Sequence, residues 1–283
     1  MSDSTRIRRY LAASAVAGVV LVVTYLVFVR TSWGQHIDDT AFDGRTVEDP
    51  AVTADTNDLL HSVTRSTLFL LTAAIVVFAL ARRRWRLAVV AGGSITAAVV
   101  TSEALKNEVL TRPQLDDVAG IDQNSLPSGH ATIGMVLALG LVMVAPHAWR
   151  WVVIGAALLI AVVFGVGVIA TGWHRPSDVV AAYAVSVMWF GFGSALLIAW
   201  RGTGRVEMGV AEERLDGRLA AAAGALTVLA AVVALVQTFT TDGLRTVEFA
   251  ADYLAVATIV ISLGVAIVVG YAQSLRGVSL DPR

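Results

Sequence analysis

Long apolar runs separated by short polar segments constrain this chain more than any other feature. Residues 151–171, for example, read WVVIGAALLIAVVFGVGVIAT, without one charged side chain. A helix needs about 20 apolar residues to cross the hydrocarbon core of a bilayer. Runs near this length occur at 11–29, 62–81, 87–105, 131–145, 151–171, 179–199, 219–238 and 253–271. The pattern predicts an all-α fold, a polytopic bundle of eight membrane helices.

Composition agrees with a membrane protein and excludes several other classes. Hydrophobic residues make up 56% of the 283 positions and the mean hydropathy is +0.71, whereas soluble domains contain about 45–50% apolar residues. Cysteine is absent, so disulfides and thiolate chemistry play no part. We see no glycine-rich nucleotide loop and no basic patch for nucleic acid, so neither is an expected partner.

The chain divides into two predicted parts. Residues 1–200 are expected to form a six-helix core, and residues 201–283 a cytoplasmic connector followed by an additional helix pair. The connector, RGTGRVEMGVAEERLDGR, mixes both signs of charge, which is typical of a solvated segment. The helix pair is expected to serve structural packing or contact with a second copy in a homodimer.

The arginines predict how the helices are oriented, because Lys and Arg are enriched in the cytoplasmic loops of membrane proteins. With the amino terminus inside, the basic clusters fall in cytoplasmic segments; they are Arg6, Arg8 and Arg9, then Arg82, Arg83, Arg84 and Arg86, then Arg150, and then Arg201, Arg205, Arg214 and Arg218. Both termini are then cytoplasmic. The expected external loops are 30–61, 106–130, 172–178 and 239–252.

The fourth run is short and opens on unusual residues. It offers about 15 apolar positions after the stretch LPSGH at 126–130, fewer than the roughly 20 that a bilayer requires. Ser128 can cap the first amides of the helix, and Gly129 lets the backbone approach a ligand closely. A helix that begins there presents unpaired N–H groups and a partial positive charge. This is a suitable place for an anion such as phosphate.

Charged side chains and two histidines gather in the same external loops. Lys106, the only lysine in the chain, and Arg112 follow the third run, and His130 opens the fourth. His174 and Asp178 lie four residues apart, so on a helix they share one face and the carboxylate can fix the tautomer of the imidazole. Cations suit a phosphoryl group, and paired histidines suit nucleophilic attack and protonation of a leaving oxygen.

Three motifs carry a resemblance to a known family; they are Lys106…Arg112-Pro113, Pro127-Ser128-Gly129-His130 and His174-x-x-x-Asp178. In this order and on one side of the membrane, they resemble the type-2 phosphatidic acid phosphatase superfamily, which includes lipid phosphate phosphatases, polyprenyl diphosphate phosphatases and vanadium haloperoxidases. The resemblance covers roughly residues 11–200.

The resemblance implies a metal-independent phosphoryl transfer that uses no cofactor. In it, His174 attacks phosphorus and forms a phosphohistidine, Asp178 holds the imidazole, and His130 protonates the departing alkoxide. The implied phosphate ligands are Lys106, Arg112, Ser128 and the Gly129 amide. The implied substrate is a membrane lipid phosphate, such as phosphatidic acid, phosphatidylglycerol phosphate or a polyprenyl phosphate, cleaved on the external face.

Two departures from the family pattern leave alternatives open. Five residues, not six, separate Lys106 from Arg112, and Gly167 and Val168 stand where the third motif usually has Ser-Arg. We hypothesise that Arg175 supplies the missing positive charge. The other interpretations are a weakened catalyst, a different substrate, a phosphotransferase that uses the same site, and a lipid binder or transporter without catalysis.

Other polar residues of these loops have simpler predicted roles. Glu103 and Glu108 flank Lys106 and are expected to form structural ion pairs with it. The first external loop contains His36, His61, Asp38, Asp39 and Asp43. Their spacing fits no metal site, and we interpret this segment as a solvated acidic loop.

Overall fold

The computed structural model describes residues 2–47, 50–115, 123–205 and 245–280. Its longer helices are α1 (Asp3–Thr24), α2 (Ser32–Asp43), α3 (Pro50–Ser62), α4 (Arg65–Ala81), α5 (Trp85–Ala104), α6 (Gly129–Val144), α7 (Arg150–Ala170), α8 (Pro176–Arg201) and α10 (Arg245–Ser274). Single helical turns occur at Tyr25–Val29, Gly44–Val47, Leu105–Val109 and His147–Trp149. Two short strands, β1 (Gly204–Arg205) and β2 (Val278–Ser279), pair antiparallel.

Most of the predicted membrane spans are present as helices. Five segments are long and apolar enough to cross a bilayer, namely Asp3–Val29, Trp85–Val109, His147–Ala170, Pro176–Arg201 and Asp252–Ser274. Helices α3 and α4 pass the same test together but are bent by 68°. Helix α6 is apolar and short, as its sequence predicts. The predicted all-α membrane bundle is confirmed, and the chain is a multi-pass membrane protein; the run at 219–238 lies outside the described residues.

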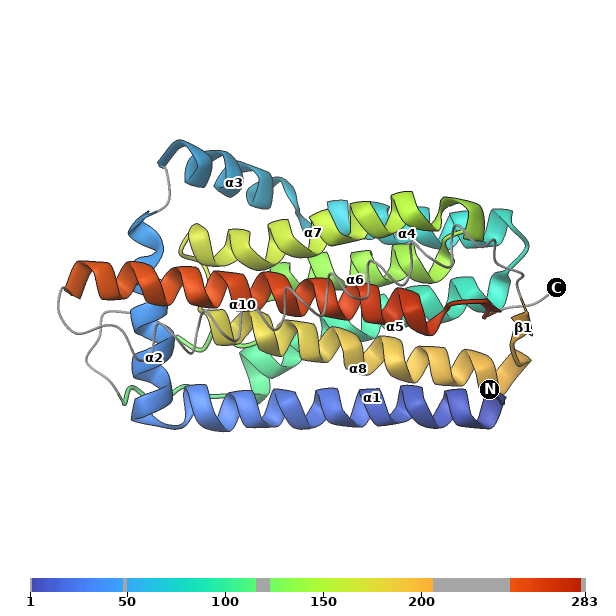
Figure 1. Cartoon of the computed structure of the whole chain (residues 1–283), viewed down its shortest axis with the longest axis horizontal. Coiled ribbons are helices and arrows are strands. Elements are labelled where there is room, and N and C mark those ends of the chain that lie inside the picture. The colour runs from blue at the N-terminus through green and yellow to red at the C-terminus, as the bar shows by residue number, and fades with distance from the viewer. Residues whose placement is uncertain (1, 48–49, 116–122, 206–244, 281–283) are drawn as a thin grey trace.

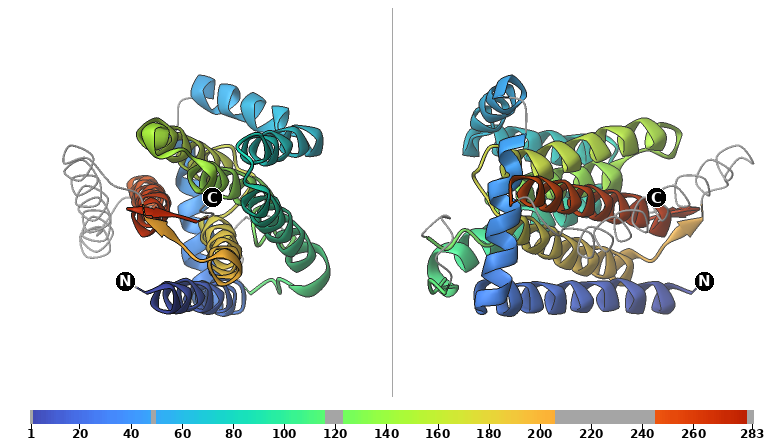
Figure 2. Two further views of the ribbon diagram at one scale, coloured as in Figure 1. Left: turned by 90° about the vertical axis from the view of Figure 1, so that its right-hand side faces the viewer. Right: turned by 60° about the vertical axis from the view of Figure 1, so that its left-hand side comes forward.

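Helix α6 occupies the centre of the bundle. It contacts α4, α5, α7, α8 and α10, and nearly every one of its side chains is buried. The end-on view in Figure 2 shows the other helices arranged around it. Small residues permit this close packing: a Cβ added at Gly134 would lie 2.4 Å from the Cβ of Phe164 in α7. The polar residues that begin α6 are therefore held by helices on several sides.

The outer surface of the bundle is apolar. Large hydrophobic side chains such as Phe69, Val77, Val152 and Leu159 are more than half exposed. In water such a surface would be costly, whereas the acyl chains of a bilayer solvate it. The helices thus show the arrangement of a membrane protein, with small residues packed inside and large apolar residues facing lipid.

The two ends of the bundle differ in structure (Figure 1). At one end α2 lies across the long helices beside the start of α8, and α3 packs against α7. At the other end, Asp3 accepts hydrogen bonds from the amide and hydroxyl of Thr203, and β1 pairs with β2. The start of α1 and the end of α10 therefore lie at the same end, away from α2. Helix α10 runs alongside α7 and also contacts α2 and α8.

Candidate active site

The first turns of α6 and α8 are hydrogen-bonded to each other, at the end of the bundle where α2 lies. Ser128 caps α6, and its Oγ accepts a hydrogen bond of 3.2 Å from the amide of Ala131. The amide of Ser128 donates to the carbonyl of Asp178, 3.0 Å away, within the first turn of α8. This bond brings the second and third motifs side by side, although 50 residues separate them along the chain.

The loop before α8 positions His174. Helix α7 ends at Ala170, and Gly172 turns the chain with φ of +74°, a conformation that strongly favours glycine. The amides of Trp173 and His174 then both donate to the carbonyl of Val168 at 3.0 Å. These two bonds fix the backbone immediately before the helix.

His174 and Asp178 form a buried pair. Nδ1 of His174 lies 3.0 Å from Oδ2 of Asp178, and the same oxygen accepts the amide of Arg175 at 3.0 Å. Asp178 is fully buried and the side chain of His174 is 12% exposed. A proton on Nδ1 that donates to the carboxylate leaves Nε2 with its lone pair, which is the form a nucleophile requires. The spacing of four residues predicted the contact as a shared helical face, but His174 precedes α8 and reaches Asp178 from the loop.

His130 lies in the first turn of α6, directly after Gly129, and its ring contacts Trp173, the residue before His174. Its ring packs edge-on against the ring of Trp173, with the ring centroids 5.0 Å apart. The ring of His61 also packs edge-on against Trp173, at a centroid distance of 4.6 Å. The indole Nε1 of Trp173 donates to Asn57 of α3 at 3.1 Å. Helix α3 therefore helps to hold the indole that orients His130.

Lys106 lies over the start of α6, in the helical turn that continues α5. Its Nζ is 2.9 Å from Oε1 of Glu103, so the predicted ion pair with Glu103 is confirmed. A Cβ added at Gly129 would lie 3.5 Å from this Nζ and 2.9 Å from the Glu103 oxygen. Any larger residue at 129 would displace the two charged groups. We call Glu103, Lys106, Ser128 and Gly129 the lysine cluster.

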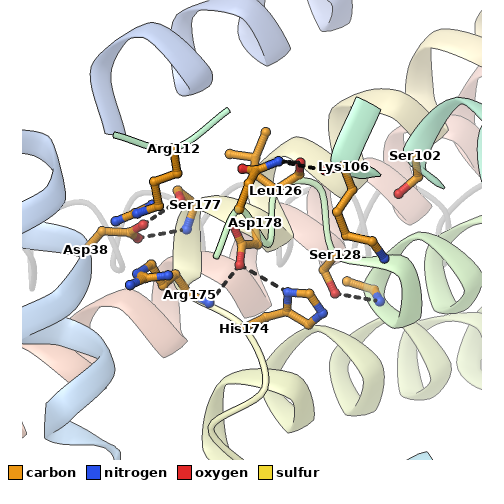
Figure 3. Close-up of polar contacts among 12 residues, drawn as sticks. Asp38, Ser102, Lys106, Arg112, Leu126, Ser128, His174, Arg175, Ser177 and Asp178 are labelled. Atoms are coloured by element: carbon orange, nitrogen blue, oxygen red, sulfur yellow. Dashed lines mark hydrogen bonds and ion pairs between the residues drawn. The ribbon is translucent and has the colours of Figure 1, made fainter. Parts of the chain in front are cut away.

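Arg112 and Arg175 do not join the lysine cluster. Both contact one carboxylate of α2: Nε of Arg175 hydrogen-bonds Oδ1 of Asp39, and Nη2 of Arg112 is 3.6 Å from the same oxygen. Asp38 accepts from the amide of Ser177 at 2.9 Å and from its hydroxyl at 2.5 Å. We call Asp38, Asp39, Arg112, Arg175 and Ser177 the arginine cluster. Figure 3 shows Arg112, Asp38 and Arg175 on one side of the His174–Asp178 pair, and Lys106 with Ser128 on the other.

Burial changes the acid–base properties of the arginine cluster. The pKa of Asp38 rises to about 7, because the carboxyl is buried and the carboxylate of Asp178 lies near it. The pKa of the Arg112 guanidinium is lowered by burial and by the neighbouring charge of Arg175. Each of these effects comes from placing several charged groups in a small volume without water.

The interpretation of this segment as a solvated acidic loop is wrong for Asp38 and Asp39. Both belong to helix α2 and are nearly inaccessible, with exposures of 2% and 3%. Buried carboxylates require partners, and here the partners are two arginines and the first turn of α8. Asp43, at the end of α2, is about one-third exposed and lies 3.6 Å from Arg45.

Apolar packing replaces the polar pair that the family's third motif usually has. Val168 is fully buried, and a Cβ added at Gly167 would lie 3.0 Å from Thr56 of α3. A larger side chain at position 167 would therefore press against α3. Within the described ranges, no group of three or more histidine or carboxylate side chains is arranged to hold a metal ion.

A comparison with known families decides what these motifs belong to. Residues 87–201 match the model of the PAP2 superfamily. The resemblance to this superfamily is confirmed. The matched segment contains all three motifs, from Lys106 to Asp178. The aspartates of α2 lie outside the PAP2 segment, so no motif could have indicated them.

Other known proteins add little to the PAP2 match. No curated protein matches the chain. Among solved structures, the chain is similar to the first transmembrane PAP2 type phosphatidylglycerolphosphate phosphatase from Bacillus subtilis, with 19% identity and a TM-score of 0.48. The alignment covers 69% of this chain and 95% of that one.

Proposed function

We propose that the chain is an integral membrane phosphatase that removes phosphate from a membrane lipid through a phosphohistidine intermediate. The observation that carries the proposal is the buried pair of His174 and Asp178, placed beside His130 and Lys106 at the start of two helices. The PAP2 match of residues 87–201 supports the same class of activity. The substrate is a phosphomonoester or diphosphate whose tail remains in the bilayer.

The proposed reaction has two steps. Nε2 of His174 attacks phosphorus as the bond to the lipid oxygen breaks, and His130 donates a proton to that oxygen. Water then attacks the phosphohistidine, with His130 as general base, and inorganic phosphate leaves. Asp178 stabilises the imidazolium charge that develops on His174. No metal ion has a part in either step.

The lysine cluster and the arginine cluster hold the phosphoryl group in different ways. Lys106, Ser128 and the Gly129 amide bind the phosphoryl oxygens directly, because the amides and the helix dipole at the start of α6 favour an anion there. Arg112 and Arg175 add positive charge from the other side of His174. Since both already contact Asp39, we expect a weaker contribution from each of them.

The site is proposed to face outside, with both termini in the cytoplasm. The arginine clusters near the start of α1 and at the ends of α4 and α8 support this orientation, because they lie at the opposite end of the bundle from His174. A lipid phosphate in the outer leaflet would then reach the site from the membrane side.

The apolar residues at 167 and 168 favour a second candidate, a protein that binds a lipid phosphate without cleaving it. Phosphate release separates the two candidates. Purified protein in detergent is incubated with short-chain phosphatidic acid, phosphatidylglycerol phosphate and a polyprenyl phosphate, with and without vanadate and EDTA. The phosphatase predicts release that vanadate abolishes and EDTA leaves unchanged. Binding of a lipid phosphate without release from any of the three would support the binder instead.

A further inference from the structure

A cavity of about 360 Å³ lies between α1, α8 and α10. Its deeper wall includes Leu139, Val187 and Ile267, and its lining also includes Arg6, Arg9 and Arg276. The arginines come from the start of α1 and from the residues just after α10. The cavity is therefore apolar at one end and basic at the other.

This cavity lies at the opposite end of the bundle from His174. Helix α8 begins beside the candidate active site and runs to Arg201, and the next residues of the chain bond to Asp3 at the start of α1. Arg6 and Arg9 belong to the first turns of α1, so they lie at this far end (Figure 1). The cavity and the candidate active site are thus two separate places in the molecule.

Aromatic side chains with satisfied hydroxyl groups form part of the wall. The hydroxyl of Tyr10 is 2.7 Å from Oγ of Ser274, and the hydroxyl of Tyr271 is 2.9 Å from Oγ of Ser194. The two tyrosine rings meet edge-on at 6.4 Å. Because their polar atoms bond within the protein, these residues present mainly ring surface to the cavity.

Two arginines of α1, Arg6 and Arg9, line the cavity. In the part of the chain that the structure describes, neither Arg6 nor Arg9 forms an ion pair, and the buried Nε of Arg6 has no hydrogen-bond partner. The two residues are three positions apart, so they project from the same side of the helix. Snorkelling toward lipid headgroups would explain why arginines occur at this end of α1. It would not explain the cavity beside them.

We propose that this cavity binds one anionic phospholipid of the leaflet opposite the candidate active site. An acyl chain occupies the apolar part between α1 and α10, and the phosphate contacts Arg6, Arg9 and Arg276. The volume lies within the range of about 300–1,000 Å³ typical of ligand sites. Basic pockets between membrane helices are suited to acidic lipid headgroups, and within the described residues Arg6 and Arg9 form no ion pair that would compete for the phosphate.

The first test fills the cavity. Gly270 lines it, and a Cβ added there meets no heavy atom within 4 Å, so Gly270→Leu adds apolar volume at the cavity wall from an uncrowded position. Gly155 of α7 also has open space around it but does not line the cavity, which makes Gly155→Leu the matched control. The proteins are purified from vesicles of phosphatidylglycerol and phosphatidylcholine, and native mass spectrometry counts the lipids that each retains.

We expect the wild type and Gly155→Leu to retain one phosphatidylglycerol in preference to phosphatidylcholine, and Gly270→Leu to lose it. Excess inorganic phosphate should not displace the lipid, because the acyl chain supplies part of the binding. Equal retention in both glycine variants, or no preference for the anionic lipid, would overturn the proposal. Displacement by inorganic phosphate would show a simple anion site and overturn it as well.

The second test removes the charge. The double variant Arg6→Gln/Arg9→Gln should bind phosphatidylglycerol about 30-fold more weakly, since each basic residue near an anionic lipid contributes about fivefold. Arg8→Gln is the control, because Arg8 is exposed on the same helix and does not line the cavity. An equal effect of the double variant and Arg8→Gln would mean that the arginines act only through general surface charge, and the proposed site would be rejected.

Discussion

The lysine cluster and the arginine cluster contain similar charges but differ in their access to solvent. In the lysine cluster, the side chains of Lys106 and Glu103 are 21% and 43% exposed. In the arginine cluster, the side chains of Arg112 and Asp39 are each 5% exposed. An exposed ion pair contributes little and exchanges partners readily, whereas a buried one loses much stability when a partner is removed. From this comparison we propose that the first cluster serves substrate binding and that the second mainly stabilises the fold around the site.

We expect the largest loss of activity from a change in the His174–Asp178 pair, which lies between the two clusters. His174→Ala removes the proposed nucleophile, so the rate of phosphate release should fall about 10⁴-fold or more. Phosphate release from a short-chain lipid phosphate measures it. The variant His36→Ala, in the exposed first turns of α2, serves as the control and should retain wild-type turnover. A His174→Ala protein with activity near that of the wild type would place the nucleophile elsewhere.

Asp39→Asn tests whether the arginine cluster is structural. The change leaves two guanidinium groups in a buried region without their shared carboxylate, so the free energy of unfolding should fall by about 3–5 kcal/mol. Thermal unfolding in detergent measures the loss. The matched control is Asp43→Asn on the same helix, where a partly exposed ion pair should contribute less than about 1 kcal/mol. Equal unfolding temperatures of the two variants would contradict the comparison.

Neutral substitutions of one cation from each cluster, Lys106 and Arg112, compare how much each cluster contributes to catalysis. Lys106→Met removes a cation over the start of α6, and we expect kcat/KM to fall about 10²–10³-fold. Arg112→Met should reduce kcat/KM about tenfold, because Asp39 already offsets part of its charge. Steady-state kinetics on one lipid phosphate gives both values. A larger loss in Arg112→Met than in Lys106→Met would reverse the assigned roles.

The last prediction concerns the pH dependence of stability. In the folded protein the pKa of Asp38 is about 7, and in the unfolded chain it is about 3.9. Between these values the folded state binds a proton that the unfolded state does not, so the free energy of unfolding decreases as the pH rises from about 4 to 7. Asp38→Asn should remove this part of the slope. Unfolding temperatures of both proteins at pH 5, 6 and 7 measure it, and an unchanged slope in the variant would assign the dependence to another group.

Much of the fold could be predicted from the sequence, because membrane helices are encoded locally. Uninterrupted apolar runs predicted α1, α5, α7, α8 and α10, and the short run after LPSGH predicted that α6 would be a short helix. The contact between His174 and Asp178 was also predicted, because the two residues are close in sequence, although His174 lies in the loop before α8 and not on the helix itself.

The arginine cluster could not be predicted, because its contacts join distant parts of the chain. Asp39 and Arg175 are separated by 136 positions. The buried face of α2 consists largely of polar and small residues, with Gln35 and the two aspartates turned inward, so no apolar period indicated which side would be covered. A periodic pattern of apolar residues indicates a buried helix face only when the residues on that face are apolar. The position of Arg175 was open for the same reason, and its role as a phosphate ligand stays a proposal.

The central claim is that His174 carries the phosphoryl group, and trapping that intermediate tests it most directly. A lipid phosphate labelled with ³²P in its phosphoryl group is mixed with excess protein, quenched in base within one turnover, and the labelled peptide is mapped. The account predicts a base-stable, acid-labile phosphate on His174 of the wild type, and none in His174→Ala. Release of labelled phosphate by the wild type without any phosphohistidine, or label on a different residue, would contradict it.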